Sequence, residues 1–312
     1  MANDDSVLRA DFPIPYKTIE EANNHLIEKP PEEHDALIAT LPLQPSVTRP
    51  LTFTHPLRLY KGVWISEFLL RGALAMQQHL KSRPTDLFLA CSPKSGTTWL
   101  KALIFATLTR NSYPLDQHPL RTYNPHQCVP YLEREFAIGR NQIIEVIPSP
   151  RVMRTHLPYS ILPESIRDSD CRIVYVWRDP KDVLVSQWCF AQKILGGANN
   201  IATFEQVYEF FCQGVSDYGP IWNDVVGYWE ESKRRPEKIL FLKYEHILQE
   251  PIKHAKKLAL FIGHPYSEAE ENKGVVEQIV ELCSFQKLKN FDANVAGEIG
   301  RPGMKISHTY FF

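Results

Sequence analysis

Three short apolar runs, each followed by a segment of helical character, constrain the fold of this chain more than any other feature. The runs are "DLFLAC" (Asp86 to Cys91), "RIVYVW" (Arg172 to Trp177) and "KILFLKY" (Lys238 to Tyr244). Nearly continuous apolar strands are typical of a parallel sheet that is covered by helices on both faces. Strands that alternate with helices, here beginning near Thr97 and Pro180 and in "EPIKHAKKLALFIG", predict a doubly wound α/β fold with a central parallel sheet.

The length and the distribution of proline suggest one domain preceded by an arm. The chain has 312 residues, 44% of them hydrophobic, which is enough for one large α/β domain or two small ones. Residues 1–45 are rich in proline and charge, so we expect a partly mobile N-terminal arm with one short helix near Pro31 to Leu41. Residues 46–312 are assigned to a single domain.

Charge and hydropathy narrow the class of protein. Lysine and arginine number 35 against 36 acidic residues, a net charge of −1, which argues against a general nucleic-acid binder. The N-terminus "MANDDSVLRADFP" is polar and acidic, unlike a signal or transit peptide. No apolar run approaches the roughly 20 residues of a membrane helix. We therefore expect a cytoplasmic protein without a membrane or nucleic-acid partner.

The six cysteines are scattered and form neither a C-x-x-C pair nor a Cys/His cluster with metal-ligand spacing. Such spacing favours reduced, mostly packed thiols, and no metal site is expected.

In an open α/β sheet ligands bind beyond the carboxyl ends of the strands, which directs attention to the loops at 92–97 and 178–180. The first loop, in "LACSPKSGTTWLKALIF", joins a strand to a helix. Gly96 allows close approach of a ligand to the backbone, Thr97 and Thr98 add hydroxyl groups at the positive end of the helix dipole, and Lys94 adds a full charge.

A Gly-Thr pair alone would favour an ordinary strand–turn–helix connection with a solvated Lys94 over a ligand site. The combination with Lys94 and Trp99, whose flat face could stack on a nucleobase, favours a phosphate site. The tripeptide Gly-Lys-Ser/Thr of the ATPase loop occurs nowhere in the chain. A nucleoside-triphosphate hydrolase or a P-loop kinase is therefore disfavoured.

The segment "PKSGTTW", Pro93 to Trp99, resembles the 5′-phosphosulfate-binding loop of the cytosolic sulfotransferases. These enzymes have a P-loop-like α/β fold and use 3′-phosphoadenosine 5′-phosphosulfate (PAPS) as donor, without a metal. The resemblance implies that Lys94 contacts the bridging oxygen and the sulfonate of the donor. It also assigns donor binding to the rest of the loop, Ser95, Gly96, Thr97, Thr98 and Trp99.

The second loop, in "YVWRDPKDVLVSQW", begins a helix that Asp179 can cap, with Pro180 at its first position. An Arg-Asp-Pro turn alone is more often an internal salt bridge than a ligand site. Beside the first loop it resembles the 3′-phosphate-binding region of the same family. That resemblance makes Arg178 and Ser186 the two 3′-phosphate ligands.

Three further segments carry the resemblance. "THLP" matches the segment with the catalytic histidine, which implies that His156 is the general base toward the acceptor hydroxyl. Arg154 stands where many members have lysine and could balance charge on the transferring group. Tyr244 matches an adenine contact, and "CSFQKL" resembles a Thr-Ser-Phe segment that lines the adenine, which implies the same for Ser284 and Phe285.

The acceptor is expected to be a small hydrophobic hydroxyl compound, because aromatic and apolar residues crowd several segments near the predicted site. The stretch "GVSDYGPIWNDVVGYWEESKRRPEKILFLKYE" is similar to the plant branch of the family, whose acceptors include flavonols, hydroxyjasmonates, brassinosteroids and desulfoglucosinolates. The expectation is a flavonoid or a similar phenol.

The resemblance covers roughly residues 45 to 312 and stops at "ISHTYFF", where family members continue with an Arg-Lys-Gly…Gly-Asp-Trp segment that contacts the 3′-phosphate. Two interpretations stay open: these residues are part of a longer protein, or the protein is a short form with weakened PAPS binding. The alternative to an active sulfotransferase is then an impaired paralogue that binds a small ligand or nucleotide. The oligomeric state is open too, because many relatives dimerise through the same tail.

Overall fold

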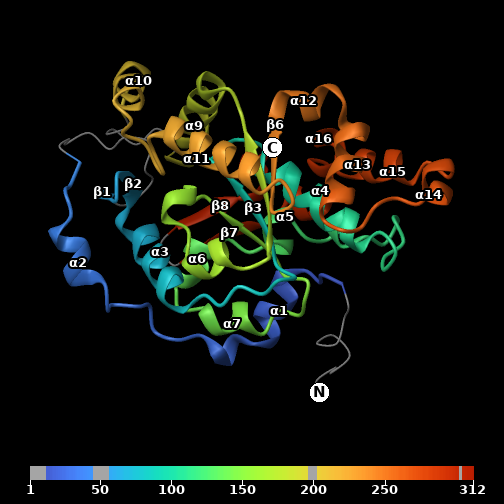
Figure 1. The fold of residues 1–312 in the computed structure, drawn as a ribbon, viewed down its shortest axis with the longest axis horizontal. Helices are drawn as coiled ribbons and strands as arrows, with labels where there is room; N and C mark the ends of the chain where they lie inside the picture. Colours follow the sequence, from blue (N-terminus) through green and yellow to red (C-terminus); the bar gives the residue numbers. More distant parts are fainter. Residues whose placement is uncertain (1–11, 45–55, 196–201, 302–303) are drawn as a thin grey trace.

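A four-stranded parallel sheet lies between layers of helices in the computed structural model, which describes residues 12–44, 56–195, 202–301 and 304–312 (Figure 1). The strands have the order β4-β3-β5-β6, and all of them run parallel. Their bounds are β3 Leu87–Cys91, β4 Val152–Thr155, β5 Arg172–Trp177 and β6 Ile239–Lys243. This is the α/β architecture with a central parallel sheet that the sequence predicts.

Alternate residues of each strand enter two different cores. Phe88 and Ala90 of β3 belong to the hydrophobic cluster on one face of the sheet, whereas Leu87, Leu89 and Cys91 belong to the cluster on the other face. Because side chains of a strand point alternately to its two faces, burial of both faces requires apolar residues throughout. The strand predictions agree with the structure to within a residue at each end for this reason.

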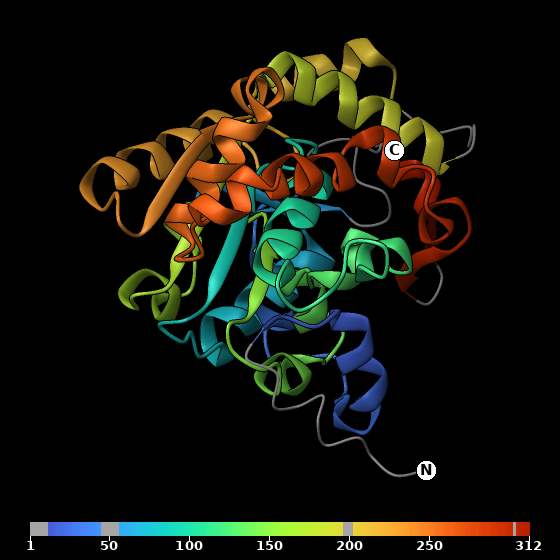
Figure 2. The ribbon, with the colours of Figure 1, turned by 90° about the vertical axis from the view of Figure 1, so that its right-hand side faces the viewer.

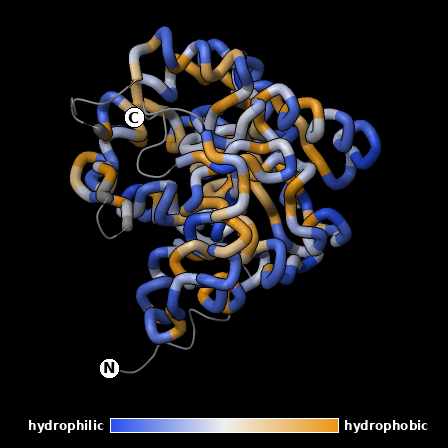
Figure 3. The backbone as a smooth tube through the Cα atoms, turned by 90° about the vertical axis from the view of Figure 1, so that its left-hand side faces the viewer, coloured by the Kyte–Doolittle hydropathy of each residue, from blue (hydrophilic) through white to orange (hydrophobic). Residues whose placement is uncertain are grey.

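The helices cover both faces of this sheet and one end of it. The first core contains residues of α3 and α6, and the second contains residues of α4, α13 and α15. In Figure 3 hydrophobic stretches gather in the middle of the molecule and hydrophilic ones follow mostly the outer helices. The bounds are α1 Tyr16–Ala22, α2 Asp35–Thr40, α3 Glu67–His79, α4 Thr97–Thr109, α5 Pro125–Cys128, α6 Leu132–Ala137, α7 Asn141–Glu145, α8 Glu164–Asp168, α9 Pro180–Leu195, α10 Phe204–Cys212, α11 Ile221–Arg234, α12 Tyr244–Gln249, α13 Pro251–Phe261, α14 Glu268–Asn272, α15 Val275–Leu282, α16 Phe285–Leu288 and α17 Asp292–Val295.

Two antiparallel hairpins lie outside the central sheet. They are β1 Leu57–Tyr60 with β2 Val63–Ser66, and β7 Glu298–Arg301 with β8 Met304–Ser307. After β8 the last residues, drawn in red, lie beside α9 (Figure 2), where the rings of Phe311 and Phe190 are 5.7 Å apart. This contact brings the end of the described chain to the carboxyl edge of the sheet.

The segment at 12–44 packs on the domain. Its helix α2 lies within the helix expected near 31–41, and Ile14, Tyr16 and Ile19 are buried in the first core. Residues 1–11 and 45–55 lie outside the described ranges, so the arm and its boundary at 45/46 stay a prediction.

All six cysteines fall within the described ranges and have free thiols, and four of them, Cys91, Cys128, Cys171 and Cys283, are buried. None of the helices in the ranges that the structure describes is both long and apolar enough to cross a membrane.

Candidate functional site

A cavity of about 580 Å³ opens at the carboxyl edge of the sheet. Each of the four parallel strands delivers a residue to its wall directly after the strand ends: His156 after β4, the loop with Lys94 after β3, Arg178 after β5 and Tyr244 after β6. Because parallel strands present their carboxyl ends at one edge, residues far apart in the chain meet here. The structure thus joins both predicted loops and the predicted histidine in one cavity.

The loop between β3 and α4 has a backbone that few sequences allow. Lys94 and Gly96 have φ values of +70° and +97°. A Cβ on Gly96 would lie 2.5 Å from Cε2 of Tyr244, so only glycine permits the ring to pack against the loop. Trp99 meets the same ring edge-on, with centroids 6.1 Å apart. The ring of Tyr244 therefore packs against both the loop and the amino end of α4, on the wall of the cavity.

The charged side chains on the cavity wall are all of one sign. Its lining includes Lys94, Arg154, Arg178 and Lys193 and no acidic side chain among the described residues. Burial, followed by the repulsion of Lys193 and Arg178, lowers the pKa of Lys94 to about 8. The Lys94 ammonium lies over the ring of Phe190, 3.9 Å from its centroid. Such a cluster of cations is suited to an anion with more than one charge.

Arg178 extends from the end of β5 across the loop. Its Nη1 donates a hydrogen bond to the carbonyl of Lys94 at 3.2 Å, and its guanidinium lies over the ring of Tyr244. Its Nη2 is 3.6 Å from the exposed carboxylate of Asp182, whereas its buried Nε has no partner in the described structure. Asp179 caps α9 as predicted, since its Oδ1 accepts from the amide of Lys181 at 2.9 Å. The Arg178 guanidinium therefore has one hydrogen-bond donor without a partner among the described residues.

His156 is held by three groups. Its Nδ1 is 2.5 Å from the carbonyl of Cys91, and its amide donates to Oε1 of Glu133 at 2.7 Å. A carbonyl can only accept, so Nδ1 carries the proton and Nε2 is free of one. Arg154 donates to this Nε2 and lies over the ring of Tyr131. Burial, and next the charge of Arg154, lower the pKa of His156 well below 6.5, which keeps the ring neutral.

The three residues that the resemblance predicts to contact adenine also lie on the cavity wall. Ser284 and Phe285 line the cavity together with Tyr244. The Ser284 hydroxyl also caps α16 by accepting from the amide of Lys287 at 3.2 Å. The Phe285 ring is more than half exposed and lies 6.1 Å from the ring of Phe312.

All but one of the predicted site residues lie on the wall of this cavity. The exception is Ser95, which is buried and whose hydroxyl has no hydrogen-bond partner in the described structure. The residues on the wall are His156, Lys94, Gly96, Thr97, Thr98, Trp99, Arg178, Ser186, Tyr244, Ser284 and Phe285. Their roles toward a ligand stay predictions.

Sequence reasoning did not name several further lining residues, among them His126, Cys189, Phe190 and Lys193. Lys193 lies two turns beyond Ser186 on α9, so the helical period could have indicated it. His126 belongs to the four-residue helix α5, and its local sequence gives no sign that the ring reaches α4.

The cavity residues fit a phosphorylated and sulfated nucleotide. Four cations line the cavity, no described acidic side chain does, the Arg178 Nε is unpartnered, and several aromatic rings are part of the lining. Among the described residues no group of three or more His, Cys, Asp or Glu is placed to hold a metal ion.

Comparisons with known proteins identify the family. Residues 84–312 match the family model described as "Sulfotransferase domain". "Cytosolic sulfotransferase 17" of Arabidopsis thaliana is 40% identical over 303 residues, which cover 94% of this chain and 86% of that protein. "Flavonol 3-sulfotransferase" of Flaveria bidentis is 43% identical over 261 residues, 84% of this chain and 82% of its own.

Solved structures agree in fold. A crystal structure of an Arabidopsis thaliana sulphotransferase superposes with a TM-score of 0.70 and 36% identity, covering 82% of this chain and 85% of its own. A mouse sulfotransferase complexed with PAP has a TM-score of 0.58 at 24% identity over 75% of this chain and 76% of its own, which supports the fold alone. The chain therefore belongs to the sulfotransferase family and is a sulfotransferase.

Proposed function

We propose that this chain transfers the sulfonate of PAPS to a hydroxyl of a small hydrophobic acceptor of the flavonoid type. The observation that carries the proposal is one cavity, lined by four cations, no described acidic side chain and the neutral His156. The names of two relatives, "Flavonol 3-sulfotransferase" and "Flavonol 4'-sulfotransferase", support the acceptor class. The relatives named cytosolic sulfotransferases support a cytoplasmic location.

In this proposal His156 is the general base. Its Nδ1–H is engaged by the carbonyl of Cys91, which leaves Nε2 to take the proton of the acceptor hydroxyl. Arg154 now donates to that Nε2, so the acceptor hydroxyl would take the place of this donor. The displaced guanidinium would then be free to hold negative charge near the reacting oxygen.

The donor supplies the sulfonate when bound, and the rest of the cavity would bind and orient it. Lys94, in the loop at the amino end of α4, would stabilise negative charge on the leaving phosphate. Arg178 and Ser186 would hold the 3′-phosphate. Trp99, Tyr244 and Phe285 offer flat faces to the adenine.

The test is the reaction itself. The purified chain is incubated with PAPS and a panel of flavonols in the presence of EDTA, and sulfated products are measured by mass spectrometry. We expect product, and we expect His156→Ala to lower kcat by about 10²- to 10⁴-fold, the usual contribution of a general base. Lys94→Ala should lower kcat/KM as well.

Two results would count against the proposal. Binding of adenosine 3′,5′-bisphosphate without product from any acceptor would favour the impaired, ligand-binding paralogue. Full activity of His156→Ala would remove the histidine from the mechanism.

A further inference from the structure

Thr98, Lys101 and His126 form a chain of polar contacts at the amino end of α4. Oγ1 of Thr98 is 3.0 Å from Nε2 of His126, which comes from α5. One turn further along α4, Nζ of Lys101 is 3.3 Å from Nδ1 of the same ring and 2.8 Å from the carbonyl of Val129. Lys101 is 1% exposed, whereas Thr98 and His126 line the cavity.

The direction of these hydrogen bonds follows from the groups involved. Burial, and next the charges of Lys101 and Arg154, lower the pKa of His126 well below 6.5, so the ring carries one proton. We take Lys101 as the ammonium, which can only donate, to Val129 O and to Nδ1 of His126, whereas a neutral amine could accept from Nδ1–H instead. Nδ1 of His126 therefore accepts, the proton resides on Nε2, and Thr98 Oγ1 accepts from it.

The consequence concerns the proton of the Thr98 hydroxyl. A hydroxyl has one donor hydrogen that otherwise rotates among several directions. Since Oγ1 receives a hydrogen bond from His126, its own hydrogen must point away from the ring. Phe311 packs on the imidazole, with ring centroids 4.2 Å apart, and limits its movement.

We infer that His126 is a positioning residue that aims the Thr98 hydroxyl at an anionic oxygen on the 5′ side of the donor. This inference rests on the proposed function, because it takes the cavity to bind an adenosine bisphosphate. Lys101 acts one step earlier by selecting the tautomer of His126. None of the three residues needs to move when the ligand enters, so the hydroxyl is oriented in advance.

The inference is tested by calorimetric titration of the full chain with two nucleotides, adenosine 3′,5′-bisphosphate and adenosine 3′-monophosphate. His126→Phe should weaken binding of the bisphosphate by about three- to tenfold, the range of one neutral hydrogen bond. It should leave binding of the 3′-monophosphate unchanged, because that ligand has no 5′ phosphate. Unfolding curves of each variant confirm that it is folded.

Two amide variants act as a matched pair. The amide nitrogen of His126→Gln can occupy the place of Nε2 and donate to Thr98, whereas the shorter side chain of His126→Asn reaches only the place of Nδ1. We expect Gln to restore bisphosphate affinity and Asn to behave like Phe. In a Thr98→Val background, His126→Phe should have no further effect.

The possible outcomes distinguish a failure of the proposed function from a failure of the inference about His126. Absence of bisphosphate binding by the folded parent would overturn the proposed function and this inference with it. Bisphosphate binding by the parent with equal affinity in His126→Phe would overturn the inference alone. So would additive losses from His126→Phe and Thr98→Val, because they would show that the two residues act independently.

Discussion

Gly96 combines a backbone conformation and a contact that other residue types cannot share. Its φ is +97°, and a Cβ would lie 2.5 Å from the ring of Tyr244. Gly62, in the β1–β2 turn, has φ +80°, but a Cβ at this position would meet no atom within 4 Å, so it serves as a matched control. Substitutions at these two glycines therefore distinguish the effect of backbone strain, which both share, from the effect of a clash with Tyr244, which only Gly96 has.

We expect Gly62→Ala to lower the free energy of unfolding by about 1–2 kcal/mol through left-handed strain, and Gly96→Ala to lower it by at least as much. Only Gly96→Ala should also weaken binding of adenosine 3′,5′-bisphosphate, because the methyl group must displace Tyr244 from the cavity wall. Urea unfolding and calorimetric titration measure the two effects. Equal nucleotide affinities in the two variants would contradict this account of the loop.

At the scale of elements, the sequence predicts the strands of the central sheet well and the hairpins poorly. Each of the three predicted strands is buried on both faces, so its composition alone reveals it. The β1–β2 hairpin turns through Lys61 and Gly62, with φ values of +49° and +80°. Such two-residue turns usually carry Asn-Gly or Asp-Gly, and the lysine hides the signal.

The site residues, too, divide into those with a local sequence signal and those without one. The loops with Lys94 and Arg178 could be located because each follows a predicted strand, whereas His156 and Tyr244 are assigned through the family resemblance. His126 could not be located, because its place on the cavity wall depends on the contact of α5 with α4, which no local pattern encodes.

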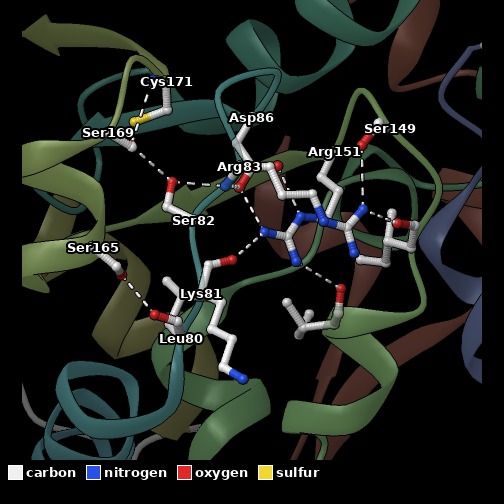
Figure 4. Close-up of polar contacts among 12 residues, drawn as sticks. Leu80, Lys81, Ser82, Arg83, Asp86, Ser149, Arg151, Ser165, Ser169 and Cys171 are labelled. Carbon is white, nitrogen blue, oxygen red and sulfur yellow. Dashed lines mark hydrogen bonds and ion pairs between the residues drawn. The ribbon is translucent and has the colours of Figure 1, made fainter.

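The opposite edge of the sheet is held by a buried ion pair (Figure 4). Arg151, just before β4, donates from Nε and Nη2 to the carboxylate of Asp86, just before β3, at 2.8 and 2.6 Å. Nη2 also donates to the carbonyl of Lys81 at 2.7 Å. Both side chains of the pair are 0% exposed. Arg83, drawn beside them, is partly exposed and bonds mainly to carbonyl groups.

Removing Arg151 leaves the buried carboxylate of Asp86 without its counter-charge. We expect Arg151→Met to lower the free energy of unfolding by about 3–5 kcal/mol, and the double change Arg151→Met with Asp86→Leu to cost less than the single one. Arg83→Met is the matched control and should cost no more than about 1 kcal/mol, because its charge stays near solvent. Nucleotide affinity should be unchanged in all three. A smaller loss from Arg151→Met than from Arg83→Met would contradict the assignment.

At the scale of the whole molecule, a stabilising ion pair and the ligand cavity lie at opposite ends of the parallel strands. At the amino edge the buried charges of Arg151 and Asp86 neutralise each other. At the carboxyl edge the cations of the cavity face one another without an acidic lining residue in the described structure. Repulsion between these cations is relieved when an anion binds, and this relief adds to the free energy of binding.

The protonation of Lys94 depends on the repulsion between the cavity cations and on whether an anion is bound. Folding lowers its pKa from 10.5 to about 8, so the unfolded chain binds more protons between these two values. The contribution of Lys94 to the free energy of unfolding of the ligand-free chain should therefore increase as pH rises from about 8 to 10.5. A bound polyanion acts in the opposite direction, because it favours the charged amine and raises the pKa again.

Binding of adenosine 3′,5′-bisphosphate at pH 8 should consequently take up about half a proton at Lys94, because an amine whose pKa is about 8 is half protonated there. The phosphates contribute little, since their second pKa of about 6 leaves them ionised at pH 8. Calorimetric titration in two buffers of different ionisation enthalpy measures the uptake, with Lys94→Met as control. At pH 6 the parent should take up almost no proton at this residue. Equal uptake by the parent and Lys94→Met at pH 8 would mean that the anion does not bind beside Lys94.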